Sequence, residues 1–157
     1  MAISNGFVRV FALLICFFNS SLQGHDDDSP EHLIDHLRAR SAKGEPQATY
    51  LLASEYDQGG ILVKNEKKAL ELFRKAADLG NPAAQLVLAK RYASGSGLEK
   101  DKVEAYKWAL LSSKRGGEVA KALLPRFKKA LSAQEKIKAE KLAETWQVEF
   151  QKKKAEK

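Results

Sequence analysis

Cysteine is almost absent from this sequence: Cys16 is the only one among 157 residues. It lies inside an apolar run, residues 10–18, which reads VFALLICFF. If that run is cleaved off on export, the mature chain carries no thiol, which excludes disulfides and cysteine-bound metal. A chain without thiols suits an oxidising compartment, where a stray thiol is a liability.

Long apolar runs are also scarce, and residues 10–18 form about half of the roughly 20-residue stretch that a membrane span needs. The run follows Arg9 in a start without acidic residues, and the small, polar residues 19–24 come after it. This order predicts a signal peptide over residues 1–24, and therefore a periplasmic or secreted protein that meets the membrane only through this segment before cleavage. An uncleaved anchor or a buried strand is the alternative.

Sequence motifs for catalysis are missing. The chain has no G-x-x-x-x-G-K phosphate loop, no G-x-S-x-G elbow and no H-E-x-x-H zinc motif. Residues 94–97 read SGSG, but no Lys-Ser or Lys-Thr pair follows them, so we interpret them as a turn. We expect a protein that is not an enzyme and that binds no cofactor.

Histidine is rare, with three in the chain. His32 and His36 are four residues apart on an expected helix, next to Glu31 and Asp35, and two imidazoles with a carboxylate can hold zinc. A metal-dependent hydrolase would have to use this pair. A closed zinc site needs four ligands, and no further His or Cys follows, so we predict a solvated polar face and no metal site.

The net charge of +7 is unevenly spread. Residues 25–113 carry 13 Lys and Arg against 14 Asp and Glu, whereas residues 114–157 carry 13 against 6. Such a basic segment can bind nucleic acid or an anionic membrane. No aromatic residues are interleaved to stack bases, so we expect no nucleic-acid partner. The segment is either a solvated helix face or an attachment to anionic envelope lipid or polymer.

An internal repeat of 36 residues organises the chain. Residues 44–79 align without a gap on residues 80–115, and ten of the 36 positions are identical. Glycines, small residues and aromatic residues predominate among the positions that we interpret as structural, which are Gly44, Ala48, Tyr56, Gly59, Ala69, Gly80, Ala84, Tyr92, Gly95, Ala105, Trp108 and Gly116.

Each unit is predicted to be a helix hairpin. The first helix opens with Gly-x-Pro, since proline fits a first helical turn, and apolar residues at a spacing of four give it one packing face. In the first unit Gly59 ends this helix, and Asn65 can cap the second by accepting free backbone N–H groups. Gly95 and Asp101 take these places in the second unit.

Both ends extend the repeat in degraded form. Leu33 and Leu37 align with the packing positions of a second helix, which predicts an incomplete leading unit. At the other end, Ser132-Ala133-Gln134-Glu135 has the form of a capping box and starts a long helix. Its predicted stripe is Ala139, Leu142, Ala143, Trp146 and Phe150.

A stack of hairpins exposes apolar ends, so an atypical terminal helix that seals the last unit is expected. The predicted fold is all-α, a short right-handed α-solenoid with about two complete repeats and degenerate capping helices. Its parts are 25–43 (acidic start and leading helix), 44–79 (repeat one), 80–115 (repeat two), 116–131 (partial repeat three) and 132–157 (capping helix and basic tail).

The pattern Tyr92-x-x-Gly95-x-Gly97-Leu98-x-x-Asp101-x-x-x-Ala105-x-x-Trp108 resembles the Sel-one-like repeat family, which is related to tetratricopeptide repeats. The resemblance implies a scaffold that binds a protein or peptide partner on the concave side, where the first helices lie. The candidate contacts between the packing positions of those helices are Tyr50, Ser54, Glu55, Leu86, Lys90 and Arg91.

Overall fold

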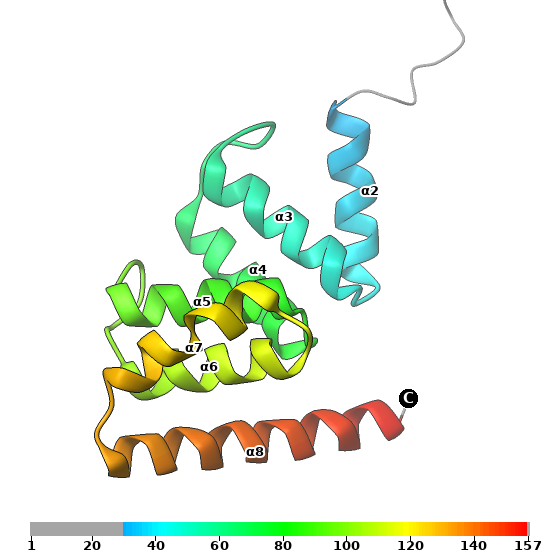
Figure 1. The fold of residues 1–157 in the computed structure, drawn as a ribbon. Helices are drawn as coiled ribbons and strands as arrows, with labels where there is room; N and C mark the ends of the chain where they lie inside the picture. The colour runs from blue at the N-terminus through cyan, green and yellow to red at the C-terminus, as the bar shows by residue number, and fades with distance from the viewer. Residues whose placement is uncertain (1–29, 157) are drawn as a thin grey trace, which may run out of the picture. The chain divides into compact units, whose positions relative to one another are not determined.

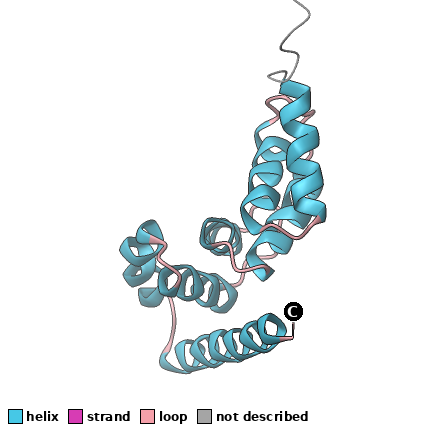
Figure 2. Ribbon diagram, turned by 90° about the vertical axis from the view of Figure 1, so that its right-hand side faces the viewer, coloured by secondary structure: helices cyan, strands magenta, loops and turns pink. Residues whose placement is uncertain are grey.

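The helices of the chain follow the 36-residue period. The computed structural model describes residues 30–156, so the predicted signal peptide and residues 25–29 lie outside the described residues. Figure 2 draws helices and loops, and no strand, in this described part. The seven helices there are α2 (Pro30–Ala42), α3 (Pro46–Gln58), α4 (Glu66–Asp78), α5 (Pro82–Ser94), α6 (Lys102–Lys114), α7 (Glu118–Lys129) and α8 (Ala133–Ala155).

The first helices of the two repeats, α3 and α5, begin and end as predicted. Each has proline in its first turn. Gly59 and Gly95 follow their last residues with φ of 74° and 81°, and their N–H groups donate to the carbonyls of Glu55 and Arg91. A side chain is strained in this left-handed conformation, so glycine is the residue that ends these helices at low cost.

The second helices, α4 and α6, begin at capping side chains. The Asn65 side chain accepts the N–H of Lys68 at 2.9 Å. Asp101 accepts the N–H groups of Val103 and Glu104 at 2.8 and 3.0 Å. Both caps confirm the prediction from the sequence.

One cap was missed in the sequence. Asn81 accepts the N–H of Ala84 at 2.9 Å and so caps α5. Its amide also donates to the side chain of Gln47 at 2.9 Å, which ties α5 to the start of α3.

Alanine dominates the core of the unit that runs from Ile34 onward. Ala53, Ala69, Ala84 and Ala89 are completely buried, as are further alanines of α4 and α6. Such small side chains allow helices to approach closely, and larger residues such as Leu88 fill the remaining space. The repeated alanines are therefore packing positions, as the repeat predicts.

The last helix, α8, lies beside α6 and runs in the same direction (Figure 1). Ala139 and Ala143 are fully buried, and the ring of Trp146 lies 6.0 Å from that of Trp108. This helix covers apolar surface of the second repeat, as expected for a capping helix. The predicted stripe is wrong at Leu142, which is 37% exposed because it lies on the edge of the contact face.

The leading helix α2 also differs from its predicted register. Leu33, which the alignment assigned to a packing position, is 51% exposed, whereas Ile34 and Leu37 are 2% and 5% exposed. Ile34 and Leu37 form a cluster with Ala48 and Leu52 of α3. Within the described residues no helix precedes α2 to cover position 33, so the buried face is the one turned to α3.

None of the helices in residues 30–156 combines the length and the apolar character that a membrane span requires.

Candidate functional site

The first helices of consecutive repeats meet at two places, which we name the first and second seams. The first seam lies between α3 and α5 and contains Asp57, Glu66 and Arg91. The second seam lies between α5 and α7, at the start of α6, and contains a groove. All of these residues belong to the unit that begins at Ile34.

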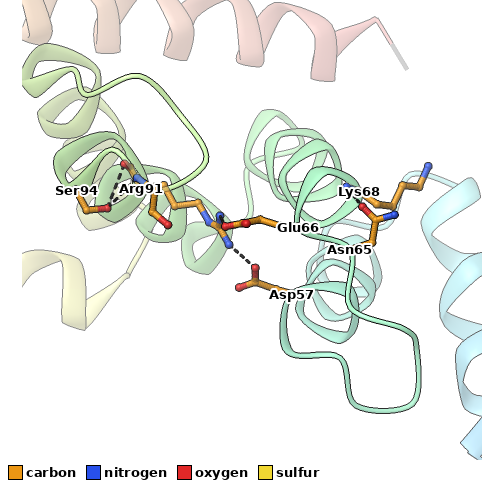
Figure 3. Close-up of polar contacts among 7 residues, drawn as sticks. Asp57, Asn65, Glu66, Lys68, Arg91 and Ser94 are labelled. Carbon is orange, nitrogen blue, oxygen red and sulfur yellow. Dashed lines mark hydrogen bonds and ion pairs between the residues drawn. The ribbon is translucent and has the colours of Figure 1, made fainter.

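Ion pairs close the first seam. The Arg91 guanidinium bonds to the Asp57 carboxylate and lies 3.4 Å from that of Glu66 (Figure 3). Its side chain is only 10% exposed, and its guanidinium carbon stands 5.7 Å from the ring centroid of Phe73. Arg91 therefore joins α5 to α3 and to the start of α4.

The candidate contact residues of α3 also have partners within the chain. Tyr50 packs on Phe73 with 5.8 Å between ring centroids, and the Ser54 hydroxyl donates to the Tyr50 carbonyl. The Glu55 carboxylate accepts the N–H of Ile61 at 3.2 Å. All three side chains are half-buried, and their role in partner contact stays a prediction.

The second seam is hollow. Its groove has a volume of about 520 Å³, within the range of ligand sites. Apolar side chains form its floor, and basic side chains stand at its rim. The lining residues are Lys90, Ala93, Ser94, Lys100, Lys102, Ala105, Leu123, Arg126, Phe127 and Ala130.

The repeat register relates the two seams residue by residue. Each residue that closes the first seam has an equivalent, 36 positions later, that lines the groove of the second. Neither carboxylate is kept, and the arginine has become an aromatic side chain. The equivalent pairs are Asp57 with Ala93, Glu66 with Lys102, and Arg91 with Phe127.

The basic side chains of the groove are not neutralised by ion pairs. In the described part of the chain, Lys90, Lys100, Lys102 and Arg126 take part in no ion pair, although other lysines and arginines do. Lys90, Lys100, Lys102 and Arg126 are all exposed. The groove therefore combines apolar side chains with basic side chains that no ion pair neutralises.

Asp101 and Glu135, two acidic residues near Lys102, are engaged elsewhere. Asp101 caps α6 through backbone N–H groups. Glu135 accepts the backbone N–H of Ser132 at 2.8 Å, and this bond lowers the pKa of its carboxyl group, with a smaller contribution from the charge of Lys102. Glu135 and Asp101 reduce the positive potential around Lys102 without pairing with it.

The sequence-based site and the groove overlap at one residue. Lys90 lines the groove, while Leu86 is a half-buried residue of α5 and Arg91 is engaged in the first seam. The candidate contacts missed the end of α5, the loop that follows it, and the residues contributed by α6 and α7. A comparison of the residues at equivalent repeat positions would have found them, because Lys102 and Phe127 break the charge pattern of the first seam.

The other candidate groups lie apart from the groove. His32 and His36 are exposed on α2, and the described residues contain no group of three or more His, Cys, Asp or Glu side chains placed to hold a metal. In the basic C-terminal segment, Lys136 lies 4.0 Å from Glu140, and the run 152–154 is exposed in the last turn of α8.

A comparison with models of known protein families finds a match to both repeats. The Sel1 repeat model matches residues 46–81 and 82–117. The two matched segments lie in tandem. The resemblance seen in the sequence is confirmed for the repeats, and the predicted all-α, right-handed solenoid is confirmed as the fold.

Solved structures with Sel1-like repeats are similar to this one. A protective antigen present in uropathogenic Escherichia coli strains, which displays an SLR fold, has a TM-score of 0.68 at 28% identity. The match covers 90% of this chain and 30% of the antigen chain. A Sel1 repeat protein from Oxalobacter formigenes has a TM-score of 0.59 at 28% identity, with 74% of this chain and 96% of that chain covered.

No curated protein matches the sequence. Sel1 repeat proteins are generally scaffolds for protein interaction.

Proposed function

We propose that this protein is a non-enzymatic scaffold of the cell envelope that binds a protein or peptide partner along its first helices. The observation that carries the proposal is the open groove of the second seam, because the equivalent place in the first seam is filled by the protein's own side chains. Sel1 repeats generally serve such binding, which supports the same class of function.

The shape of the groove favours an extended partner segment. Residues of α5 and α7, two helices that run in the same direction (Figure 1), line it together with residues from the start of α6. A volume of about 520 Å³ holds a few side chains and not a folded domain. A peptide or an exposed loop of a partner protein is the occupant that such a site accepts.

The location in the envelope rests on residues 1–24, whose order of charge, apolar run and small polar residues is that of an export signal. Cell fractionation followed by intact mass measurement tests it. We expect the mature protein in the periplasm or the medium, shorter by about 20 to 25 residues. An intact N-terminus in the membrane fraction would show an anchored protein instead.

Site-specific photo-crosslinking in living cells tests the binding function. A photoreactive amino acid at position 123 lies in the groove, and the same amino acid at Leu142 on α8 serves as the control. We expect a discrete adduct from position 123 and none from position 142. Adducts from position 142 alone would contradict the proposal.

The alternative function is attachment to anionic envelope lipid or polymer through the basic C-terminal segment. The exposed run of lysines at 152–154 is the feature that favours it. Binding that disappears on deletion of residues 152–157, none of which lines the groove, would identify this alternative.

A further inference from the structure

We infer that the second seam recognises an acidic segment of the partner, in which a carboxylate lies next to an apolar side chain. The carboxylate takes the place that Asp57 and Glu66 hold in the first seam, and the apolar side chain lies on the floor of the groove. This inference rests on the proposed function and specifies the chemistry of the partner.

The first seam shows that this place in the repeat accepts carboxylates. Asp57 from α3 and Glu66 from α4 both reach a cation of the following first helix, Arg91. The cation is nearly buried, so its charge needs a partner at that position. In the first seam the chain provides that partner itself.

The second seam has no carboxylate at the positions equivalent to Asp57 and Glu66, and it has more basic side chains than the first seam. Ser54 and Glu66 of the first repeat correspond to Lys90 and Lys102, and Lys90 in turn corresponds to Arg126 of α7. Like charges gathered around one groove repel each other, and an anion bound among them lowers that repulsion. The complementary occupant is therefore an acidic group.

The floor of the groove distinguishes a peptide from a simple anion. Leu123 and Phe127 are half-buried, so each leaves part of its apolar side chain accessible beside Ala93. A phosphate or a polyanion would leave this surface in water, whereas an aromatic or aliphatic side chain would cover it and gain hydrophobic free energy. A segment with both an acid and an apolar side chain matches both features.

The test begins with selection of displayed random heptapeptides on the full-length chain. We expect the enriched peptides to carry Asp or Glu next to an aromatic or branched aliphatic residue. Fluorescence polarisation then measures the affinity of a selected peptide and of its amide analogue, in which Asn or Gln replaces the acid. We expect the analogue to bind about tenfold more weakly or worse, as the loss of a charged contact entails.

A sealed variant transfers the first seam into the second by Ala93→Asp, Lys102→Glu and Phe127→Arg. We expect it to lose peptide affinity by about tenfold or more. Lys138→Glu with Lys141→Glu, a charge change on exposed residues of α8, should alter affinity by less than about twofold. If the sealed variant does not fold, Lys100→Gln with Arg126→Gln replaces it, because both side chains are exposed and without ion pairs.

The possible failures are distinguishable. Enriched peptides that lack acids, and that bind the sealed variant as well as the wild-type chain, would overturn this inference and leave the proposed function standing. A chain that selects no peptide would overturn both. Loss of binding to phosphatidylglycerol vesicles in the sealed variant, without any peptide binding by the wild type, would assign the second seam to a membrane surface instead.

Discussion

The first and second seams share a repeat position and a backbone design, but they differ in what fills the space between their first helices. In the first seam Arg91 bonds to two carboxylates of the preceding repeat and is nearly buried. In the second, apolar and basic side chains line a groove of about 520 Å³. The same hairpin geometry therefore gives a closed first seam and an open second seam.

The difference shows which positions of a repeat are free to change. Glycines at helix ends and alanines between helices are repeated because backbone conformation and close packing require them. Seam positions lie between repeats and are constrained by their neighbours across the seam. We therefore expect a change of charge there to affect binding more than the fold.

The largest loss of stability is expected from overpacking in the core of the first repeat, next to the closed first seam. Ala69 is fully buried, and Ala69→Leu should lower the free energy of unfolding by about 3 kcal/mol because the added atoms find no space. Its equivalent, Ala105, is 1% exposed but lines the groove, so Ala105→Leu should cost less, about 1–2 kcal/mol, since part of the added side chain can enter that space. Urea unfolding of both variants measures the difference. Equal costs would show that the second seam is not open.

A smaller effect should come from the turns that connect the repeats. Gly80 and Gly116 both have a φ of 86°, where a side chain is strained. A Cβ on Gly80 would also lie 2.8 Å from Arg115 Nη1 and 2.9 Å from Phe150 Cζ, whereas nothing lies within 4 Å at Gly116. We expect Gly80→Val to cost about 2 kcal/mol and Gly116→Val about 1 kcal/mol. Thermal melts followed by circular dichroism check this order, and a reversed order would contradict it.

Loss of the cation in the first seam should cost somewhat less. Arg91→Met keeps the aliphatic stem but leaves Asp57 and Glu66 without their cation. Because these carboxylates are 32% and 55% exposed, water partly compensates, and we expect a loss of about 1–2 kcal/mol. Lys90→Met, one residue earlier on α5, should change stability by no more than about 0.5 kcal/mol. Chemical unfolding of the two variants compares a closed-seam residue with a groove residue.

The smallest change in stability is expected from Glu135, the acidic residue near the second seam. The hydrogen bond from Ser132 lowers the pKa of Glu135 in the folded chain, so the bond stabilises the fold above the ordinary pKa of the carboxyl group. This contribution is lost as the pH falls through the folded pKa. We expect Glu135→Gln to lower the Tm slightly at neutral pH and to have no effect well below pH ~4. Glu144→Gln, an exposed change on the same helix, should have no effect at either pH.

Most of the fold could be predicted from the sequence because local rules determine it. The period, the left-handed glycines, and the caps Asn65 and Asp101 depend on a few neighbouring residues each. Predictions failed where an element depends on what lies next to it in space. Leu33 and Leu142 occupy helical positions that read as apolar faces, but the neighbouring helix of each meets a different face.

The candidate site was harder to predict because its residues come from three helices and the loop before α6. Arg91 was proposed as a contact from its place on a first helix, although a partner 34 residues earlier, Asp57, engages it. Lys102 and Phe127 approach Lys90 only when the repeats stack. Their charge and size differ from those of the equivalent residues in the first seam, and this difference was the available signal.

The central claim is that the second seam is open to an acidic segment and the first is not. NMR tests it on the full-length chain after its lysine amines have been reductively methylated with an isotope-labelled reagent. Lys100 lines the groove, and Lys64 is its equivalent in the first seam. On titration with a selected acidic peptide, the account predicts shifts of the Lys90, Lys100 and Lys102 resonances and none for Lys64. Shifts confined to the lysines of α8, or equal shifts of Lys64 and Lys100, would contradict it.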